Sequence, residues 1–346
     1  MIPFLKKGAA ELFPGYFALV MATGALSIGS HLLGLTWVSL PLLYMNILAY
    51  LILWLLTITR LLLFPSYILA DITSHTKGPG FFTLVAGTCV FGSQLIIVGN
   101  HIAIANYLWG LGIVLWMVVM YTFFTAVTVR KNKPHLDEGI NGAWLIAAVA
   151  TQSISILGTL LSDYTDHGRV AMLFFTLCMY FLGCMLYLNI ITLIFYRFTF
   201  LRLEHASLTP PYWINMGAVA ITTLAGSTLI LHAENWSLLM EITPFIKGFT
   251  MFFWVTGTWW IPLLFILMIW RHLYHRYPLT YEPQFWGMAF PLAMYTTSTF
   301  QLSKALEVPF LLVIPKVMVY IALFTWVAIF MGLLHHLFKS YKEVSV

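Results

Sequence analysis

Long apolar stretches without charge alternate with short polar links along this chain. Asp, Glu, Lys and Arg are all absent between Glu11 and Arg60, and again between Lys77 and Arg130. Each stretch is long enough for two helices of about 20 mainly apolar residues, the length that crosses a bilayer. The pattern predicts an all-α membrane protein with one transmembrane domain, residues 1–346, and ten spans at 14–33, 37–64, 80–99, 102–128, 142–161, 169–196, 212–231, 245–270, 286–305 and 312–338.

The basic residues indicate an orientation, because Lys and Arg are enriched in cytoplasmic links. With the N-terminus inside, four of them fall outside: Arg169, Lys247, Lys304 and Lys316. The other thirteen fall inside: Lys6, Lys7, Arg60, Lys77, Arg130, Lys131, Lys133, Arg197, Arg202, Arg271, Arg276, Lys339 and Lys342. We therefore predict a multi-pass protein of the plasma (inner) membrane with both termini in the cytoplasm.

The odd-numbered spans begin alike, with Pro, Gly or Asn followed by an aromatic residue. These aromatics, Phe17, Phe82, Trp144, Trp213 and Trp286, lie 65, 62, 69 and 73 residues apart, which is one helical hairpin each time. The first helix of each hairpin is rich in small and hydroxyl residues, whereas the second is bulky. Small residues allow close helix packing. The repeat predicts five hairpins in a quasi-fivefold arrangement, with five inner helices around a central pore.

Composition excludes several classes of protein. Only 8% of the residues are charged and 61% are hydrophobic, whereas a soluble domain carries about 25% charged residues. A net charge of +5, dispersed along the chain, gives no basic patch for nucleic acid. The three cysteines lie inside apolar runs and offer neither a disulfide framework nor metal-ligand spacing. With no catalytic motif in view, we predict no enzyme activity, no metal and no cofactor.

One large ring stands out on the predicted inner helices. Phe290 lies four residues after its repeat aromatic and is followed by Pro291, which removes a backbone hydrogen bond and kinks a helix. Gly24, Gly87 and Gly217 are candidate kinks in three other inner helices. We predict that Phe290 plugs the pore. The alternative is that its ring packs against a neighbouring helix.

A dehydrated ion in a pore needs charge or hydrogen-bonding groups along its path, and the inner helices carry no Lys or Arg at mid-span. Hydroxyl and amide groups could replace part of its hydration shell. The candidates are Thr23, Thr88, Thr151, Gln152, Ser153 and Asn215. Alternatively, these side chains bond to their own helix or join two helices. Lys304 and Lys316 could make an outer vestibule positive, or Lys304 could pair with Glu307 three residues later.

The segments Pro14-Gly15-Tyr16-Phe17 and Ala289-Phe290-Pro291-Leu292, with the ten-span layout, resemble the tellurite-resistance/dicarboxylate transporter family. That family includes TehA-type bacterial proteins, yeast malate and sulfite transporters, and plant slow anion channels. The resemblance covers residues 13–339. It implies a homotrimer in which each protomer has its own pore, inner helices kinked by Pro or Gly, and an occluding Phe that falls on Phe290. The fifth span departs from this pattern, since it has no Pro or Gly between Gly142 and Gly158.

The function that follows is an anion channel, or a channel-like transporter, for small inorganic or organic anions. A proton-coupled carrier of a C4-dicarboxylate such as malate, or a sulfite or tellurite transporter, is the alternative. Coupling usually relies on an intramembrane Asp, Glu or His, and none lies at mid-span. A haem-containing oxidoreductase is more remote, because haem needs axial histidines inside the bundle and the eleven histidines lie near span ends or in links.

Overall fold

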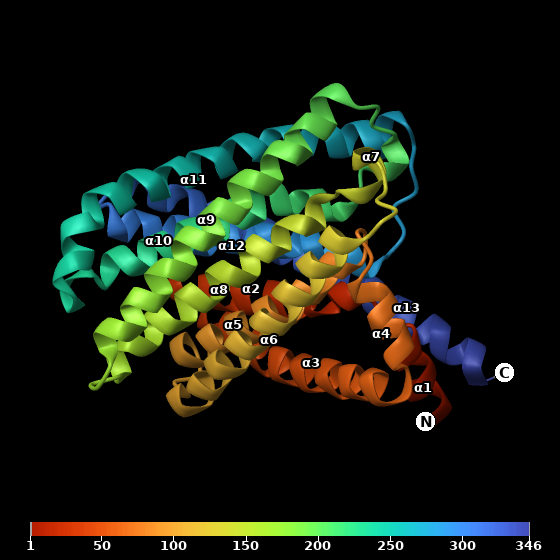
Figure 1. Cartoon of the computed structure of the whole chain (residues 1–346), viewed down its shortest axis with the longest axis horizontal. Coiled ribbons are helices and arrows are strands. Elements are labelled where there is room, and N and C mark those ends of the chain that lie inside the picture. Colours follow the sequence, from red (N-terminus) through yellow and green to blue (C-terminus); the bar gives the residue numbers. More distant parts are fainter. Residues whose placement is uncertain (1, 346) are drawn as a thin grey trace.

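The computed structural model describes residues 2–345, and throughout them the regular secondary structure is helical. Ten long helices form five antiparallel hairpins (Figure 1). The first helices of the hairpins are α2 (Ala18–Leu32), α5 (Phe82–Ile97), α8 (Ile146–Leu161), α10 (Ile214–Leu231) and α12 (Trp286–Ala305). The second helices are α3 (Thr36–Leu63), α6 (Ile102–Val129), α9 (Arg169–Phe200), α11 (Ser237–Ile269) and α13 (Val313–Ser345). Short helices α1 (Ile2–Ala10), α4 (Pro65–Ile72) and α7 (Leu136–Gly139) complete the fold.

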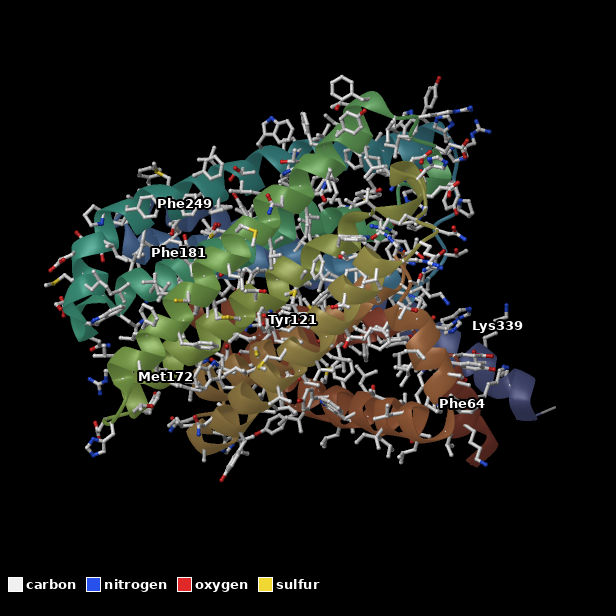
Figure 2. The ribbon with its side chains drawn as sticks, in the orientation of Figure 1. Phe64, Tyr121, Met172, Phe181, Phe249 and Lys339 are labelled. Carbon is white, nitrogen blue, oxygen red and sulfur yellow. The ribbon has the colours of Figure 1, made fainter. Side chains whose placement is uncertain are left out.

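The five first helices form a closed inner ring. Each inner helix packs against the next in the order α2, α5, α8, α10 and α12, and α12 packs against α2 to close the ring. In the first four of these spans, 83% to 94% of the residues are buried, against 22% to 44% in the outer helices. Figure 2 shows the long apolar and aromatic side chains of the outer helices, such as Tyr121, on the surface of the bundle. Bulky residues therefore lie where lipid would be, and small residues lie where helices must approach each other.

Nine helices within residues 2–345 are long and apolar enough to cross a membrane. The remaining inner helix, α12, is too polar for that criterion because it contains several Ser and Thr residues, Gln301 and Lys304. It packs against α2, α10 and α13, so most of its surface meets protein rather than lipid. Its 20 residues rise about 30 Å, which matches the hydrocarbon core of a bilayer.

Each inner helix is entered through a tight 3₁₀ turn at the same end of the bundle. The turns are η1 (Pro14–Phe17), η2 (Gly78–Phe81), η3 (Gly142–Leu145), η6 (Pro210–Trp213) and η9 (Pro283–Phe285), and they contact one another in a second closed ring. Proline fits the start of a helix because its missing N–H has no intrahelical acceptor there. In η3, the Asn141 side chain accepts a hydrogen bond of 2.9 Å from the backbone N–H of Ala143.

Arginines at the ends of four outer helices hold this end together. Three of them donate to a carbonyl oxygen that precedes the inner helix of the same hairpin: Arg130 to Thr73 (3.1 Å), Arg197 to Ile140 and Arg271 to Leu208. The fourth, Arg60, instead pairs with the Asp71 carboxylate at 2.7 Å. We call these four the clamp arginines. They fasten the end of each outer helix to the segment that leads into an inner helix.

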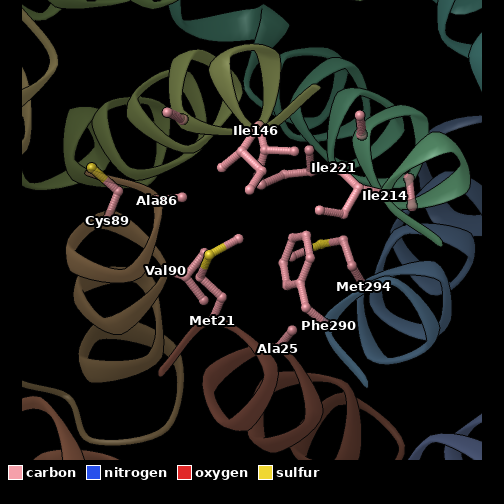
Figure 3. Close-up of a cluster of buried hydrophobic side chains, with 14 of the residues drawn as sticks. Met21, Ala25, Ala86, Cys89, Val90, Ile146, Ile214, Ile221, Phe290 and Met294 are labelled. Carbon is pink, nitrogen blue, oxygen red and sulfur yellow. The ribbon is translucent and has the colours of Figure 1, made fainter. Parts of the chain in front are cut away.

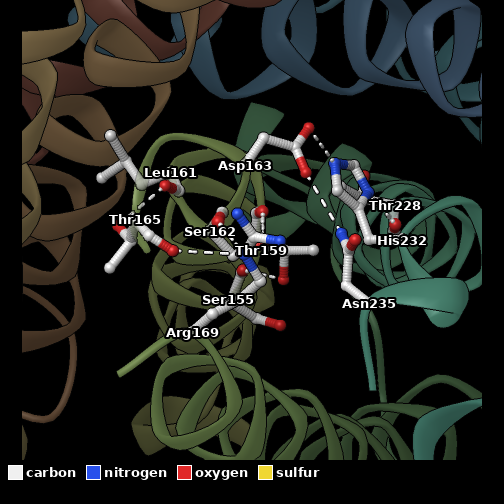
Figure 4. A network of polar contacts seen from close by, with 10 residues as sticks. All are labelled: Ser155, Thr159, Leu161, Ser162, Asp163, Thr165, Arg169, Thr228, His232 and Asn235. Carbon is white, nitrogen blue, oxygen red and sulfur yellow. Dashed lines mark hydrogen bonds and ion pairs between the residues drawn. The ribbon is translucent and has the colours of Figure 1, made fainter. Parts of the chain in front are cut away.

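The opposite end of the bundle is joined by a polar network (Figure 4). The Asp163 carboxylate lies 3.1 Å from the His232 ring and accepts from the Asn235 amide at 3.2 Å, so it links the α8–α9 turn to the α10–α11 turn. Arg169 donates through Nε to the carbonyl oxygens of Ser162 and Thr165 at 3.0 and 3.2 Å. The two ends of the ring are thus fixed by different chemistry, clamp arginines at one and an acidic network at the other.

Candidate functional site

A first cavity, the vestibule, lies on the axis of the ring at the end where the inner helices begin. The space among its lining residues is about 510 Å³ when the part open to solvent is included, and the lining includes residues of all five hairpins. Its lining consists of Phe13, Gly15, Ala18, Met21, Thr76, Lys77, Gly80, Thr83, Ala143, Ile146, Val149, Pro211, Ile214, Pro283, Gln284, Gly287 and Phe290. Because every inner helix contributes to the wall, the cavity belongs to the ring as a whole.

A second cavity, the deep cavity, lies further along the same axis. The space among its lining residues is about 270 Å³ when any part open to solvent is included, and each of the five inner helices contributes to its wall. The lining residues are Ala25, Ile28, Val90, Ser93, Ser153, Ile156, Leu224, Met294 and Thr297. Most of this wall is apolar, and its hydroxyl groups come from α5, α8 and α12.

Phe290 lies between the two cavities. Its side chain is 1% exposed and lines the vestibule, while Met294, one helical turn later, lines the deep cavity. On α2, Met21 likewise lines the vestibule and Ala25, four residues later, lines the deep cavity. Residues i and i+4 lie on one face of a helix, so both helices turn one face to the two cavities. Figure 3 shows Phe290, Met21 and Met294 pointing into the space that the ring encloses. An apolar layer therefore separates the vestibule from the deep cavity.

A close contact between α10 and α12 fixes the position of Phe290 along the axis of the inner ring. A Cβ atom added to Gly217 on α10 would lie 2.6 Å from Cγ of Pro291, so any larger residue would push the two helices apart. Pro291 also leaves the carbonyl of Gly287 without its intrahelical donor. Gly217 thus serves close packing against the turn of α12 that carries Phe290. The predicted glycine kinks at Gly24 and Gly87 are likewise packing points, for α2 and α5 continue unbroken through them.

One cation lines the vestibule. Lys77 is the charged residue of its lining, and the Lys77 amine lies 3.1 Å from the Asp71 carboxylate, which also binds Arg60. Glu11 lines the neighbouring pocket with these three residues, so the four charges beside the mouth balance and Lys77 is the one that reaches the vestibule. The five inner helices all begin here, and each helix N-terminus carries about half a positive charge. The mouth of the ring is electrostatically suited to an anion.

His75 lies in the link that leads to Lys77 and is partly buried. Burial and the nearby charges of Arg130 and Lys133 lower the pKa of His75 below its ordinary value. Its backbone carbonyl accepts a hydrogen bond of 2.9 Å from the Trp144 ring N–H. The folded protein therefore favours the neutral imidazole at this position.

The predicted pore-lining threonines point away from the axis. Each of them bonds to an aromatic side chain of an outer helix: Thr23 to Trp326 (3.0 Å), Thr88 to Tyr50 (3.1 Å) and Thr151 to Trp116 (2.9 Å). Each follows an axial residue by two positions, and two positions turn an α-helix by about 200°. They belong to the contact between the rings, so their assignment to the pore lining is corrected.

The other three polar candidates, Gln152, Asn215 and Ser153, lie in three different settings. Gln152 donates to the Tyr180 carbonyl on α9 at 3.0 Å, so it joins two helices. Asn215 is fully buried, and neither its amide nitrogen nor its amide oxygen has a partner within the described residues. Ser153 alone lines a cavity, and it bonds to the Ala150 carbonyl at 2.7 Å.

Sequence reasoning missed two hydroxyls of the deep cavity, Ser93 and Thr297. Helical spacing from the axial residues would have found both. Ala86 is the fourth residue after Phe82, as Phe290 is after Trp286, and it lies on the axis (Figure 3). Ser93 lies seven residues, about two turns, beyond Ala86 and therefore on the same face of α5. Thr297 likewise lies seven residues beyond Phe290. It bonds to the Ala25 carbonyl at 3.0 Å and so ties α12 to α2.

The two lysines predicted for an outer vestibule line neither cavity. Lys304 lies near the end of α12, with its amine 4.7 Å from the centre of the Phe300 ring. Lys316 is exposed on α13. Neither side chain faces the axis, so a positive outer mouth built from them is not what the geometry supports.

Comparison with known proteins agrees with this architecture. The family model described as voltage-dependent anion channel (SLAC1) matches residues 11–334. An uncharacterized membrane protein of Mycobacterium tuberculosis is 38% identical over 152 residues, covering 44% of this chain and 77% of that protein. An uncharacterized transporter of Methanocaldococcus jannaschii is 26% identical over 293 residues, covering 83% of this chain and 82% of the relative. A sulfite efflux pump of Trichophyton rubrum is 23% identical over 346 residues, with coverages of 93% and 89%.

The match spans most of the chain, and it confirms the family resemblance carried by Pro14-Gly15-Tyr16-Phe17 and Ala289-Phe290-Pro291-Leu292. It also agrees with a bundle whose long helices are apolar enough for a membrane. The chain belongs to the SLAC1 family of voltage-dependent anion channels, a family of helical membrane channels and transporters.

Proposed function

We propose that this protein conducts small anions along the axis of the inner ring, through a passage that Phe290 closes. The observation that carries this proposal is the pair of cavities on one axis, both walled by all five inner helices and separated by the Phe290 layer. A passage closed by one side chain can open without any rearrangement of the helices.

Anions are drawn into the vestibule by a field rather than held at one site. The five helix N-termini and Lys77 act together at the cavity mouth. Clefts with one sign of charge and low-dielectric walls raise the local concentration of counter-ions. No cation of the lining lies beyond this mouth, so an anion that enters does not meet a charge that would hold it.

The narrow region excludes water as well as ions while it is closed. Its side chains are apolar, and hydrophobic constrictions gate pores by dewetting. Beyond it, the hydroxyls of Ser93, Ser153 and Thr297 in the deep cavity can donate to a partly dehydrated anion. Each of these hydroxyls now bonds to a backbone carbonyl, and rotation about χ1 would turn it towards the axis.

Passive conduction fits the lining better than proton coupling. Proton-coupled carriers use intramembrane carboxylates or histidines, and the lining of both cavities includes neither. Among anions, sulfite is the first to test, because three relatives are named as sulfite efflux pumps.

The inner ring closes within one chain, so the passage needs no second subunit. We propose a homotrimer of independent passages in the plasma membrane, as the family resemblance implies. The basic end of the bundle, where α1 and the end of α13 also lie (Figure 1), would face the cytoplasm.

The test is anion flux through proteoliposomes that contain the purified protein. Vesicles loaded with sulfite, chloride, nitrate or malate are diluted into anion-free buffer, with and without a pH gradient, and valinomycin with K⁺ sets the potential. We expect efflux that follows the potential and the anion gradient and that ignores the pH gradient. Efflux driven by the pH gradient alone would favour the coupled carrier, and K⁺-selective current would reject anion conduction.

A further inference from the structure

Arg271 carries a buried charge that the protein does not neutralise. It is 6% exposed and lies where α11 ends, in the five-residue π-helical turn Trp270–Tyr274. It donates to the Leu208 carbonyl and lies 4.3 Å from the centre of the Tyr277 ring. Its Nε–H has no acceptor, and no carboxylate pairs with it among the described residues. A buried charge normally has a partner of opposite charge.

The fivefold repeat shows which partner is missing. Arg60 occupies the same place in the first hairpin, at the end of the outer helix and beside the start of the inner helix. There the Asp71 carboxylate binds the guanidinium at 2.7 Å. In the third hairpin, Arg197 contacts the Tyr212 hydroxyl. At Arg271 the repeat offers neither a carboxylate nor a hydroxyl: the guanidinium meets the Leu208 carbonyl and the Tyr277 ring, and it adjoins a cavity, as Arg60 does.

This cavity has a polar end and an apolar wall. The space among its lining residues is about 360 Å³ when the part open to solvent is included, and Arg271, His272 and Thr209 provide the polar groups. Leu264, Leu267 and Met268 of α11 provide the apolar wall. These three residues precede Arg271 by one to two helical turns, so they lie deeper in the bundle than the charge.

The lipid-facing side of the same helix continues the apolar wall. Phe265, Ile266 and Ile269 of α11 are 40%, 61% and 54% exposed. A ligand that bound Arg271 would thus carry its charge at the basic end of the bundle and its apolar part along α11. Anionic phospholipids have this arrangement, and basic pockets between membrane helices are known to bind their headgroups.

We propose that the Arg271 cavity binds the phosphate of an anionic phospholipid from the leaflet at the basic end of the bundle. The phosphate supplies at Arg271 the negative charge that Asp71 supplies at Arg60. The first carbons of the acyl chains lie against Leu264, Leu267 and Met268. Because the cavity adjoins η6, the entrance turn of α10, a bound lipid would also brace one wall of the ring.

The experiment is native mass spectrometry of the full chain in detergent, with dioctanoyl phosphatidylglycerol or dioctanoyl phosphatidylcholine added. We expect one phosphatidylglycerol retained per chain, and about tenfold weaker retention in Arg271→Gln, which loses a charge-assisted hydrogen bond. Met268→Trp should weaken retention similarly by filling the cavity, while leaving the contact between Arg271 and Leu208 intact. Thermal melting of each variant checks that it is folded.

Arg130→Gln is the matched control, because it removes the clamp arginine of the second hairpin, and neither Arg130 nor its partner Thr73 lines this cavity. It should retain the lipid as the native protein does. Equal retention in the native protein, Arg271→Gln and Met268→Trp would overturn the proposal, and so would equal binding of phosphatidylcholine. Displacement of the lipid by millimolar inorganic phosphate would show a site for free oxyanions instead.

Discussion

Replacing Phe290 with alanine should open the passage between the vestibule and the deep cavity. The ring of Phe290 is 1% exposed and lies in the layer that separates the two cavities. Alanine keeps the backbone and the neighbouring Pro291 but removes the ring from the axis, where Met21 and Met294 also point. The layer between the two cavities would then lose its largest side chain.

The size of the effect follows from the burial of this ring. On the proposed mechanism, an anion passes through the native protein only after the ring has left its packed position and met water in the vestibule. Exposing a buried Phe side chain costs about 1.5–3 kcal/mol, and each 1.4 kcal/mol is a factor of ten in an equilibrium. Removing that cost should raise anion conductance by about 10- to 150-fold.

The assay is electrophysiology of the purified protein in planar bilayers, together with thermal melting in detergent. Phe253→Ala is the matched control, because Phe253 is equally buried, lies on outer helix α11 and packs against Tyr187, away from the axis. Both variants lose a buried Phe and should lose about 3–5 kcal/mol of stability. Only Phe290→Ala should gain conductance. The reasoning is refuted if a folded Phe290→Ala protein conducts no better than Phe253→Ala.

Three further predictions concern the vestibule and the contacts between the rings. Lys77→Gln should lower anion conductance about threefold at 10 mM salt and very little at 1 M salt, where charges are screened beyond about 3 Å. Lys316→Gln on α13 is the control. An equal loss of conductance in both variants would show that the position of the lysine is irrelevant. Gln152→Leu should reduce stability by about 0.6 kcal/mol, the mean value of a hydrogen bond between membrane helices, because it removes the bond to Tyr180; relative permeabilities of nitrate and chloride should stay the same, and a change in them would place Gln152 in the pathway. His75 has a lowered pKa when folded, so its neutral form stabilises the protein above the unfolded pKa of about 6.5 and this contribution is lost as the pH falls. The melting temperature should therefore fall more between pH 7 and pH 5 in the native protein than in His75→Gln, and equal falls would contradict the assignment.

The sequence predicted the class of fold from properties that each helix has alone. An all-helical membrane protein of this family follows from the apolar runs and from the segments Pro14-Gly15-Tyr16-Phe17 and Ala289-Phe290-Pro291-Leu292, and this is confirmed. The threonines show where such reasoning ends. Thr23, Thr88 and Thr151 were chosen because they are polar residues on inner helices. Their direction depends on the rotation of each helix about its own axis, which only the packing of the ring sets.

The Phe290 plug remains a prediction, although the structure gives it a place. Its ring lies on the axis because α12 packs between α2 and α10 and because Gly217 lets Pro291 approach α10 closely. The pattern of polar residues along α12 does not show that Phe290 faces the axis. A helix that is surrounded by protein does not need an apolar surface, so α12 has the weakest transmembrane signal of the inner helices.

Hydrophobicity and charge along the chain determined that this protein lies in a bilayer and which end of the bundle is basic, because each span must match its own solvent. The regular spacing of the aromatic residues that follow a Pro, Gly or Asn indicated five hairpins, because each such segment starts the first helix of a hairpin. Tertiary structure alone decided which side chains face the axis, where the cavities lie and that Arg60 has a carboxylate partner whereas, among the residues described, the buried Arg197 and Arg271 do not. Those features depend on groups far apart in the sequence, such as Arg271 and Leu208, whose proximity exists only after the ring has closed.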